Sequence, residues 1–394
     1  NKMSNDLEII EEYNYNQSKS EGKNVLIACT LISVLIMVVI VVKTKTYKWC
    51  FFYIIVMFFI IEMIMYLSTN MNYFDLMHSN LINNTIVDTQ TISKYFTIPD
   101  LDVYQQKVQL GYSIAKTKKI IILSLARDVE HIVNLTFNKL TNIGKDFQEY
   151  KIIIFENDSD DNTRQVIEKW THIDSNIELM DCCNLNSCDC KLKNQKGYDM
   201  GTHSQGRMEK MRFYREYLLR YATQKYEFDY VMIYDFDISG AIYKDGLMTS
   251  FTQDFDMVFA KGLQAMPLLT FNKYFMYDNI SFIPNFINFH HNLKLKNLHN
   301  HLQKLLNHNI NSDFVKCKSG FNGMAIYKYD SIVKSTYMNS KRYCEHIDLH
   351  QDMYNKGYDK IYFNPNMILF IGQGGPDRSK FVSEIINTFN KKLD

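Results

Sequence analysis

Short apolar runs that end in acidic residues alternate with helical patterns from about residue 118 onward. The runs KKIIILSLARD and KIIIFENDSDDNT each lead from an uncharged stretch into a polar turn, and YVMIY leads into Asp235. An uninterrupted apolar run of this length is typical of a strand that is buried on both faces of a parallel sheet. Helical patterns cover residues 129–140 and 207–222. The alternation predicts an α/β fold with a doubly wound, mostly parallel sheet.

Acidic residues stand where these strands are predicted to end. Residues 177–180 add a third short strand, and Asp160 or Asp161 is placed to cap a helix that runs to Trp170. In such sheets ligands bind outside the carboxyl ends of the strands. The acids expected at this edge are Asp128, Glu156, Asp158, Asp235 and Asp237.

Composition excludes two classes of protein. A hydrophobic content of 46% and a charged content of 22% in 394 residues are ordinary for a folded chain, which excludes a mainly disordered one. With 44 Lys+Arg against 43 Asp+Glu, the net charge is +1. Because no basic field is available to neutralise a phosphate backbone, we expect no nucleic-acid partner.

Two long apolar runs precede the predicted sheet. Residues 25–42 carry no charge, and residues 51–67 carry only Glu62. Each run is long enough to cross the hydrocarbon core as a helix, and neither has the polar face that a globular helix needs. We expect an N-terminal tail at 1–23, one or two transmembrane helices within 24–67, a stem at 68–115 and a folded domain at 116–394.

Charge and cysteine content favour a lumenal domain. Lys43, Lys45 and Lys48 place the loop between the two helices in the cytosol, although Lys19 and Lys23 argue the other way. The even number of cysteines beyond the membrane region favours disulfides, and the CCNLNSCDC cluster could instead bind zinc. The cysteines beyond the membrane region are Cys182, Cys183, Cys188, Cys190, Cys317 and Cys344. We therefore expect a membrane protein of the endoplasmic reticulum or Golgi.

Asp235 and Asp237 form a DxD pair after the fourth predicted strand. A turn at the strand end can direct both carboxylates to one hard cation, and oxygen ligands suit Mg²⁺ or Mn²⁺, which also bind nucleotide phosphates. Asp also starts turns and caps helices, so the pair alone is a weak signal. The preceding helix strengthens it, because Arg207, Arg212 and Arg215 could contact phosphate or simply lie on a solvated face.

Several motifs follow one another in order between about residue 118 and residue 365. They are SLARDVE at 124–130, IIIFENDSDDNT at 152–163, the arginine-bearing helix, VMIYDFDISG at 231–240, SGFNGMAIY at 319–327 and CEHIDLH at 344–350. This order resembles nucleotide-sugar-dependent glycosyltransferases of the GT-A fold, and more narrowly the family of fungal capsule-associated mannosyltransferases and similar enzymes of protists and large DNA viruses.

The resemblance implies a membrane-anchored enzyme that moves a sugar, mannose in that family, from a nucleotide-sugar donor to a hydroxyl of a glycan or glycoprotein. It implies that Asp235 and Asp237 hold Mn²⁺ or Mg²⁺ with the donor diphosphate. Glu345 is our first choice for the carboxylate that deprotonates the acceptor, and Asp348 is the second. The implied donor-binding residues are Arg127, Asp128, Glu156, Asp158, Arg212, Arg215, Gly320, Asn322 and Gly323.

The third metal ligand is where the chain departs from the wider pattern. A downstream His completes the metal site in many of these enzymes, but no His follows His350. His350 is therefore expected to substitute, with His346 or water as the alternatives. The two histidines are spaced i,i+4 on one helix face, a spacing that surface or core histidines also show.

Two other functions remain compatible with the sequence. In a haloacid-dehalogenase-like phosphatase, Asp235 would be the nucleophile of VMIYDFDIS, but there the motif opens the domain, whereas two strand-helix units precede it here. In a non-catalytic glycan-binding membrane protein the DxD pair would have decayed, and both aspartates are present.

Overall fold

The computed structural model describes residues 86–94, 96–181, 205–265, 274–278, 280–289, 301–338 and 344–371, which all belong to one compact unit. The apolar runs at 25–42 and 51–67 lie outside these residues, as do Cys182, Cys183, Cys188 and Cys190. Within the described ranges, no helix is both long enough and apolar enough to cross a membrane.

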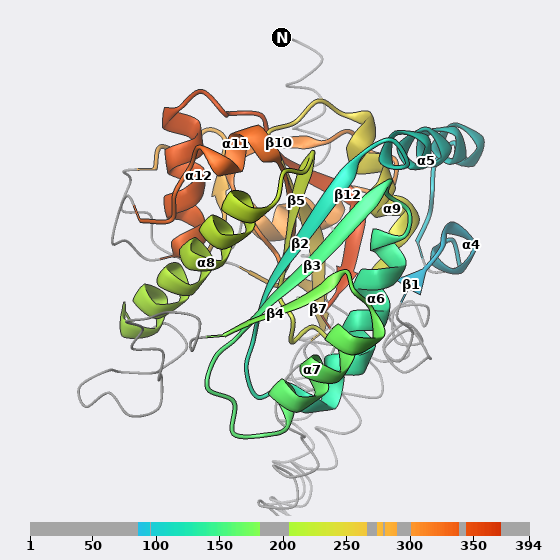
Figure 1. Cartoon of the computed structure of the whole chain (residues 1–394). Coiled ribbons are helices and arrows are strands. Elements are labelled where there is room, and N and C mark those ends of the chain that lie inside the picture. The colour runs from blue at the N-terminus through green and yellow to red at the C-terminus, as the bar shows by residue number, and fades with distance from the viewer. Residues whose placement is uncertain are drawn as a thin grey trace, which may run out of the picture. The chain divides into compact units, whose positions relative to one another are not determined.

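The predicted parallel sheet forms one part of a 12-stranded mixed sheet (Figure 1). Four strands lie in the order β4-β3-β2-β5, and each neighbouring pair is parallel. The prediction of a parallel sheet from the apolar runs is confirmed in this part. The four strands are β2 (Lys119–Ala126), β3 (Glu149–Glu156), β4 (Ile177–Asp181) and β5 (Tyr230–Tyr234).

The strand order reverses beside β2. From β2 the chain adds β3 and β4 on one side, and then returns through a helix to place β5 on the other side. In open α/β sheets a crevice forms at such a reversal, outside the carboxyl ends of the strands. A ligand site is therefore expected at the ends of β2 and β5.

The remaining eight strands form a mixed part of the sheet. Strand β11 is antiparallel to both β5 and β7, and β7 is parallel to β12. Most of these strands were not predicted, because several have only two or three residues and nearly all pair with partners far away in the sequence. They are β1 (Ile86–Val87), β6 (Ile242–Tyr243), β7 (Met257–Ala265), β8 (Tyr274–Met276), β9 (Ile283–Pro284), β10 (Val315–Ser319), β11 (Met324–Lys328) and β12 (Ile361–Phe370).

Helices cover both faces of the sheet, with α6 and α7 on one face and α8 and α12 on the other (Figure 1). Successive residues of β2 point to opposite faces, so Leu123 belongs to the core cluster that includes Leu218 of α8, and Ile122 to the cluster that includes Phe137 of α6. The helices are α4 (Thr89–Ile92), α5 (Leu101–Ala115), α6 (Val133–Gly144), α7 (Thr163–Ile173), α8 (Gln205–Lys225), α9 (Lys244–Met248), α11 (Tyr329–Val333) and α12 (Glu345–Asn355), with 3-10 turns at Glu130–Ile132, Thr249–Thr252 and Leu305–Asn307.

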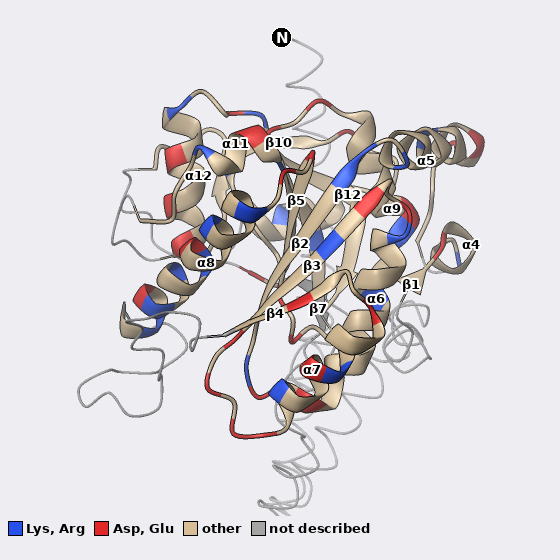
Figure 2. Ribbon diagram, in the orientation of Figure 1, with Lys and Arg blue, Asp and Glu red and all other residues tan. Residues whose placement is uncertain are grey.

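Charge is distributed as this layering requires. The middle of the central strands is nearly free of charged residues, which lie on the helices and at strand ends and loops (Figure 2). Strand β5 is uncharged and buried along its whole length. The acids that follow it therefore mark the point where the chain leaves the core.

Part of the segment predicted to be a stem belongs to the folded unit. Strand β1 pairs with β6, and Thr89 donates two hydrogen bonds to Asp245, one from its backbone N and one from Oγ1, both at 2.7 Å. On α5, Tyr104 is fully buried, and Gly111 lies so close to Met248 that a Cβ would meet its carbonyl oxygen at 2.1 Å. Residues 86–115 hence form part of the described fold.

Two smaller predictions differ from the structure. The N-cap of α7 is Asn162, while Asp161 accepts a hydrogen bond from the backbone N of Thr163 at 3.0 Å. Cys317 and Cys344 are both free and buried, each in its own part of the core, so the disulfide prediction is wrong for these two cysteines.

Candidate active site

A pocket of about 740 Å³ lies at the reversal of strand order. It is formed by the residues that follow β2, β3 and β5, by one side of α8 and by the beginning of α12. Of the residues singled out from the sequence, the pocket is lined by Arg127, Asp128, Arg207, Arg215, Asp235, Asp237, Glu345 and His346. The structure therefore brings the DxD pair, arginines and the first-choice acid into one site.

Backbone contacts fix the turn that carries the DxD pair. The backbone N of Asp235 donates to the carbonyl of Gly323 at 3.0 Å. Helix α6 holds the rest of the turn: Thr136 Oγ1 donates to the carbonyl of Phe236 at 3.1 Å, and Lys139 Nζ donates to that of Ile238 at 2.5 Å. These contacts fix the backbone of the turn, and both of its aspartates line the pocket.

The pocket makes the two aspartates hard to ionise together, although Asp235 is only partly buried and Asp237 stays exposed to solvent. Desolvation raises the pKa of Asp235 to about 7, although the ion pair with Arg215 opposes this, and desolvation also raises the pKa of Asp237. Each carboxylate adds to the cost of ionising its neighbour.

A divalent cation fits this donor set. Two carboxylates of raised pKa would be stabilised by a bound positive ion, and their oxygens suit Mg²⁺ or Mn²⁺. No cluster of three or more His, Cys, Asp or Glu side chains in the described ranges is arranged to hold an ion. The remaining ligands would have to come from water and from phosphate oxygens, which is how proteins commonly bind Mg²⁺.

Arg215 connects the DxD pair to Glu345. Its Nη2 lies 2.9 Å from Asp235 Oδ1, and its Nε lies 3.1 Å from Glu345 Oε1. The arginine side chain is only 6% exposed, and its guanidinium lies 5.3 Å from the centre of the Phe321 ring. Arg215 therefore links the predicted metal ligand Asp235 to Glu345, the predicted acceptor-activating base.

Arg212 and Asp348 form a second ion pair outside the pocket lining. Nη2 of Arg212 lies 2.6 Å and Nε 3.0 Å from Asp348 Oδ2, and both side chains are buried. The pair joins α8 to α12. Neither residue lines the pocket, and the ion pair between their side chains holds the two helices together.

His350 is not placed to bind the predicted metal. Its Nδ1 bonds with Ser319 Oγ at 2.8 Å and its Nε2 bonds with Tyr327 Oη at 2.9 Å, inside the core. Burial lowers its pKa to about 3. Both ring nitrogens are used and the ring does not line the pocket, so the prediction of His350 as third ligand is corrected.

His346 differs from His350 although the two are one helical turn apart. Its ring stacks on Phe321 with centroids 3.8 Å apart, at the pocket wall. Neither nitrogen has a hydrogen-bond partner within the described part of the chain, and burial keeps its pKa well below the usual value. Of the two predicted alternatives, only His346 reaches the pocket.

The predicted donor-binding residues that follow β2 line the pocket, and those at the end of β3 do not. Arg127 and Asp128 line the pocket, whereas Glu156 and Asp158 do not. Glu156 Oε1 accepts from the backbone N of Ser159 at 2.9 Å, which shapes the turn after β3. Between these two acids Asn157 does line the pocket, a role that no sequence signal marked.

The glycine-bearing turn, residues 320–323 between β10 and β11, lies next to the pocket. Asn322 and Gly323 have positive φ angles of 53° and 85°, and a Cβ on Gly320 would lie 2.3 Å from the Phe259 ring. Asn322 Oδ1 accepts from the backbone N of Asp278 at 3.2 Å. Of residues 320–323 only Phe321 lines the pocket, so Gly320, Asn322 and Gly323, which the sequence predicted to bind the donor, lie outside the pocket lining.

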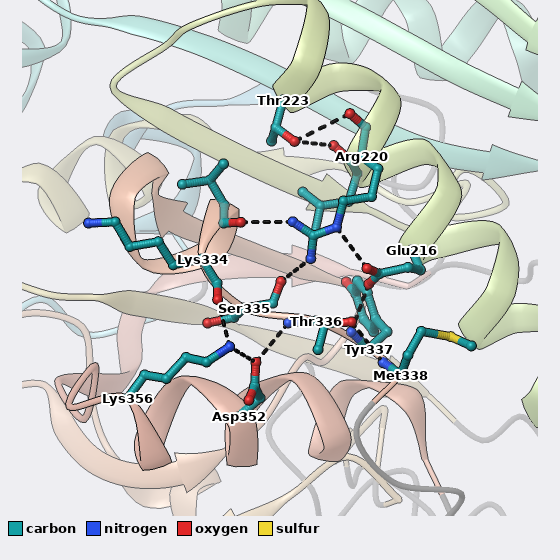
Figure 3. A network of polar contacts seen from close by, with 12 residues as sticks. Glu216, Arg220, Thr223, Lys334, Ser335, Thr336, Tyr337, Met338, Asp352 and Lys356 are labelled. Carbon is teal, nitrogen blue, oxygen red and sulfur yellow. Dashed lines mark hydrogen bonds and ion pairs between the residues drawn. The ribbon is translucent and has the colours of Figure 1, made fainter.

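Polar contacts anchor the chain that leads into α12 (Figure 3). Arg220 of α8 donates to the carbonyls of Val333 and Ser335, and Glu216 Oε2 accepts from the backbone N of Tyr337 at 2.8 Å. From the other side, Asp352 Oδ2 accepts from the backbone N of Thr336 at 2.9 Å. The segment is thus held between α8 and α12.

The comparisons with known proteins identify no family. No family model matches the chain, and no curated protein sequence does either. Among solved structures it is similar to S. aureus TarS 1-349, at 12% identity and a TM-score of 0.38, over 64% of this chain and 60% of that one. The same TarS fragment in complex with UDP-GlcNAc matches at 13% identity and 0.37, over 66% and 60%.

A second protein is similar at the same level. The mannosyltransferase PcManGT from Pyrobaculum calidifontis, in complex with GDP-Man and Mn²⁺, shares 9% identity at a TM-score of 0.34, over 71% of this chain and 67% of that one. This chain therefore spans about three fifths of the TarS fragment and two thirds of the archaeal enzyme.

Proposed function

We propose that the chain is a nucleotide-sugar-dependent glycosyltransferase. One observation carries this proposal: Asp235 and Asp237 converge with Arg207 and Arg215 in a single pocket at the reversal of strand order. A nucleoside diphosphate needs positive charge around its phosphates, and a pocket at this edge of an α/β sheet suits a nucleotide. The sugar would then lie toward Phe321 and the beginning of α12.

The charges of the pocket suit the leaving group of such a transfer. When the bond between sugar and diphosphate breaks, negative charge develops on the diphosphate, and positively charged groups fixed in advance stabilise it. Arg215 is held by Asp235 and Glu345, so its guanidinium needs little reorganisation. A divalent cation held by Asp235 and Asp237 would supply further positive charge at the diphosphate.

The finer assignments belong to the same proposal. We propose Mn²⁺ or Mg²⁺ as the cation, mannose as the transferred sugar and a glycan or glycoprotein hydroxyl as the acceptor, on the strength of the motif order in the sequence. The apolar runs at 25–42 and 51–67 support membrane anchoring. The lysines between them support a lumenal catalytic domain of the endoplasmic reticulum or Golgi.

The rival functions have less support. A phosphatase nucleophile must be an accessible carboxylate, whereas Asp235 is ion-paired to Arg215 at 2.9 Å. No contact of the described residues favours a glycan-binding protein without catalysis over an enzyme.

A donor screen tests the proposal. The full chain in detergent is incubated with a panel of nucleotide sugars that includes UDP-GlcNAc and GDP-mannose, in Mn²⁺, and release of nucleoside diphosphate is measured. We expect release from at least one donor, and none when Asp237 is replaced by Asn. Release of inorganic phosphate from simple phosphate esters, with no nucleotide sugar consumed, would favour the phosphatase instead.

A further inference from the structure

Both acids that the sequence offers as the acceptor-activating base are engaged in ion pairs. Glu345 Oε1 lies 3.1 Å from Arg215 Nε, and Asp348 Oδ2 lies 2.6 Å from Arg212 Nη2. The second oxygen of Glu345, Oε2, also accepts a hydrogen bond from Cys344 Sγ at 3.8 Å, so both of these carboxylates are already engaged by neighbouring side chains. The group that accepts the proton should therefore be sought elsewhere in the pocket.

Asp278 is a pocket carboxylate that no sequence motif marks. It follows β8 and lines the same pocket as Asp235 and Glu345. Its backbone N is held by Asn322 Oδ1 at 3.2 Å, so the glycine-bearing turn fixes its position. In contrast to Glu345 and Asp348, Asp278 forms no ion pair with any Lys or Arg of the described ranges.

Backbone hydrogen bonds hold the carboxylate of Asp278 in place, and the residue is only partly buried. Oδ1 accepts long hydrogen bonds from the backbone N atoms of Ile280 and Ser281, both at 3.3 Å. Burial raises its pKa, and the charge of Glu345 raises it further. A carboxylate of raised pKa is a better proton acceptor as long as it is ionised at the working pH. The other ionisable groups that face it are Asp235, Tyr277 and Cys344.

We propose that Asp278 is the general base of the reaction, an inference that rests on the proposed function. The acceptor oxygen attacks the anomeric carbon and forms the new glycosidic bond. The bond between that carbon and the diphosphate oxygen breaks, and its electron pair leaves with the nucleoside diphosphate. The acceptor's proton passes to the Asp278 carboxylate and from there to solvent. A single displacement of this kind inverts the anomeric configuration.

The test compares two isosteric substitutions on the full chain, with the donor that the screen identifies and water as acceptor. Asp278→Asn keeps an oxygen that can accept from Ile280 and Ser281, so the turn is preserved while the proton acceptor is lost. We expect kcat to fall by roughly 10²-fold or more with KM for the donor nearly unchanged. Glu345→Gln is the matched control, and we expect it chiefly to raise KM, because it frees Arg215.

The outcomes separate the inference from the function on which it rests. A kcat for Asp278→Asn within about threefold of the wild type, or a loss of kcat on Glu345→Gln with KM intact, overturns the role of Asp278. Proton NMR of the wild-type product, taken before mutarotation, gives a second readout that needs no variant: retained configuration also overturns it. If the wild type consumes no nucleotide sugar at all, the proposed function fails and the inference fails with it.

Discussion

Two arginines one helical turn apart on α8 have different surroundings. Arg212 and Arg215 are both buried and both bonded to an acid of α12, but only Arg215 lines the pocket. We predict that Arg212→Lys and Arg215→Lys each lower the free energy of unfolding by about 1–3 kcal/mol, because Lys cannot reproduce the guanidinium contacts.

Their effects on ligand binding should differ. Arg215→Lys should weaken binding of a nucleoside diphosphate by about tenfold or more, whereas Arg212→Lys should leave it nearly unchanged. Thermal unfolding and isothermal titration calorimetry measure the two effects. Equal losses of affinity in the two variants would contradict the assignment of Arg215 alone to the donor site.

His350 gives a prediction about acid stability. An unfolded histidine takes up a proton near pH 6.5, whereas burial holds the pKa of His350 at about 3. Between these values the unfolded chain binds more protons, so the free energy of unfolding falls as the pH decreases from 6.5 toward 3. We predict a weaker pH dependence over this range for His350→Gln, measured by urea unfolding. An unchanged slope would show that His350 titrates normally.

The sequence predicted which residues lie in the pocket better than it predicted what each of them does there. The DxD pair, Arg127, Asp128, Arg215 and Glu345 do meet in one pocket. The aspartates and Arg127 follow strands that the apolar runs revealed, Arg215 lies on the predicted arginine-bearing helix, and Glu345 begins the helix of the CEHIDLH motif. The i,i+4 spacing could not show which histidine faces the pocket, since that depends on how α12 is rotated against β10 and β11. Asp278 lies in no motif and could be found only from the fold.

Among the elements, α6 contributes most to the shape of the DxD turn. Lys139 is fully buried, and its Nζ donates to the carbonyls of Ile238 and Gly240 and to Tyr234 Oη. We predict that Lys139→Met frees the turn and weakens Mn²⁺-dependent nucleotide binding by about 10-fold or more, as loss of a supporting contact does at metal sites.

A neighbouring core position on the same helix serves as the control. Ile143→Val, one turn further along α6, removes core packing but none of the polar contacts to the turn, so it should lower stability and leave nucleotide affinity nearly unchanged. If both substitutions weaken nucleotide binding in proportion to their loss of stability, Lys139 is only a core residue.

The segment before β2 gives a prediction about where the domain begins. Asp245 accepts from Thr89 and also from Tyr112 Oη at 2.8 Å, and so connects α9 to α4 and α5. We predict that Asp245→Ala lowers the free energy of unfolding by about 2–4 kcal/mol, because the donors lose their partner. A chain that starts at residue 100 should be destabilised too, since it lacks β1 and α4. If both variants melt at the same temperature as the wild type, residues 86–99 do not stabilise the folded domain and act only as a stem.

The elements that the sequence predicted are those with strong local patterns. Strands β2, β3 and β5 are continuous apolar runs, and α8 lies where the helical pattern placed it. Strands β1 and β6 have two residues each and pair over a long sequence distance, so no local pattern could reveal them. On α5 the buried face consists of Tyr104, Val108, Gly111 and Ala115, which is too weakly apolar to distinguish a packed helix from a polar stem.

Over the whole molecule positive and negative charges are nearly balanced, but charged side chains gather at the pocket. The net charge is only +1, yet the pocket gathers carboxylates and arginines at one edge of the sheet. A charge set of this kind binds a small anionic ligand with a cation rather than an extended polyanion. The domain arrangement of membrane region and folded unit stays a prediction from the sequence.

The proposed function requires that Asp235 and Asp237 bind a nucleoside diphosphate through a divalent cation. The most direct test is calorimetric titration of UDP and GDP into the full chain, with and without Mn²⁺, for the wild type and for Asp237→Asn. We predict that Mn²⁺ tightens the Kd of at least one nucleotide by about tenfold or more, and that Asp237→Asn abolishes this gain without lowering the melting temperature. Binding that is equally tight in excess chelator, or unchanged in Asp237→Asn, would contradict the claim.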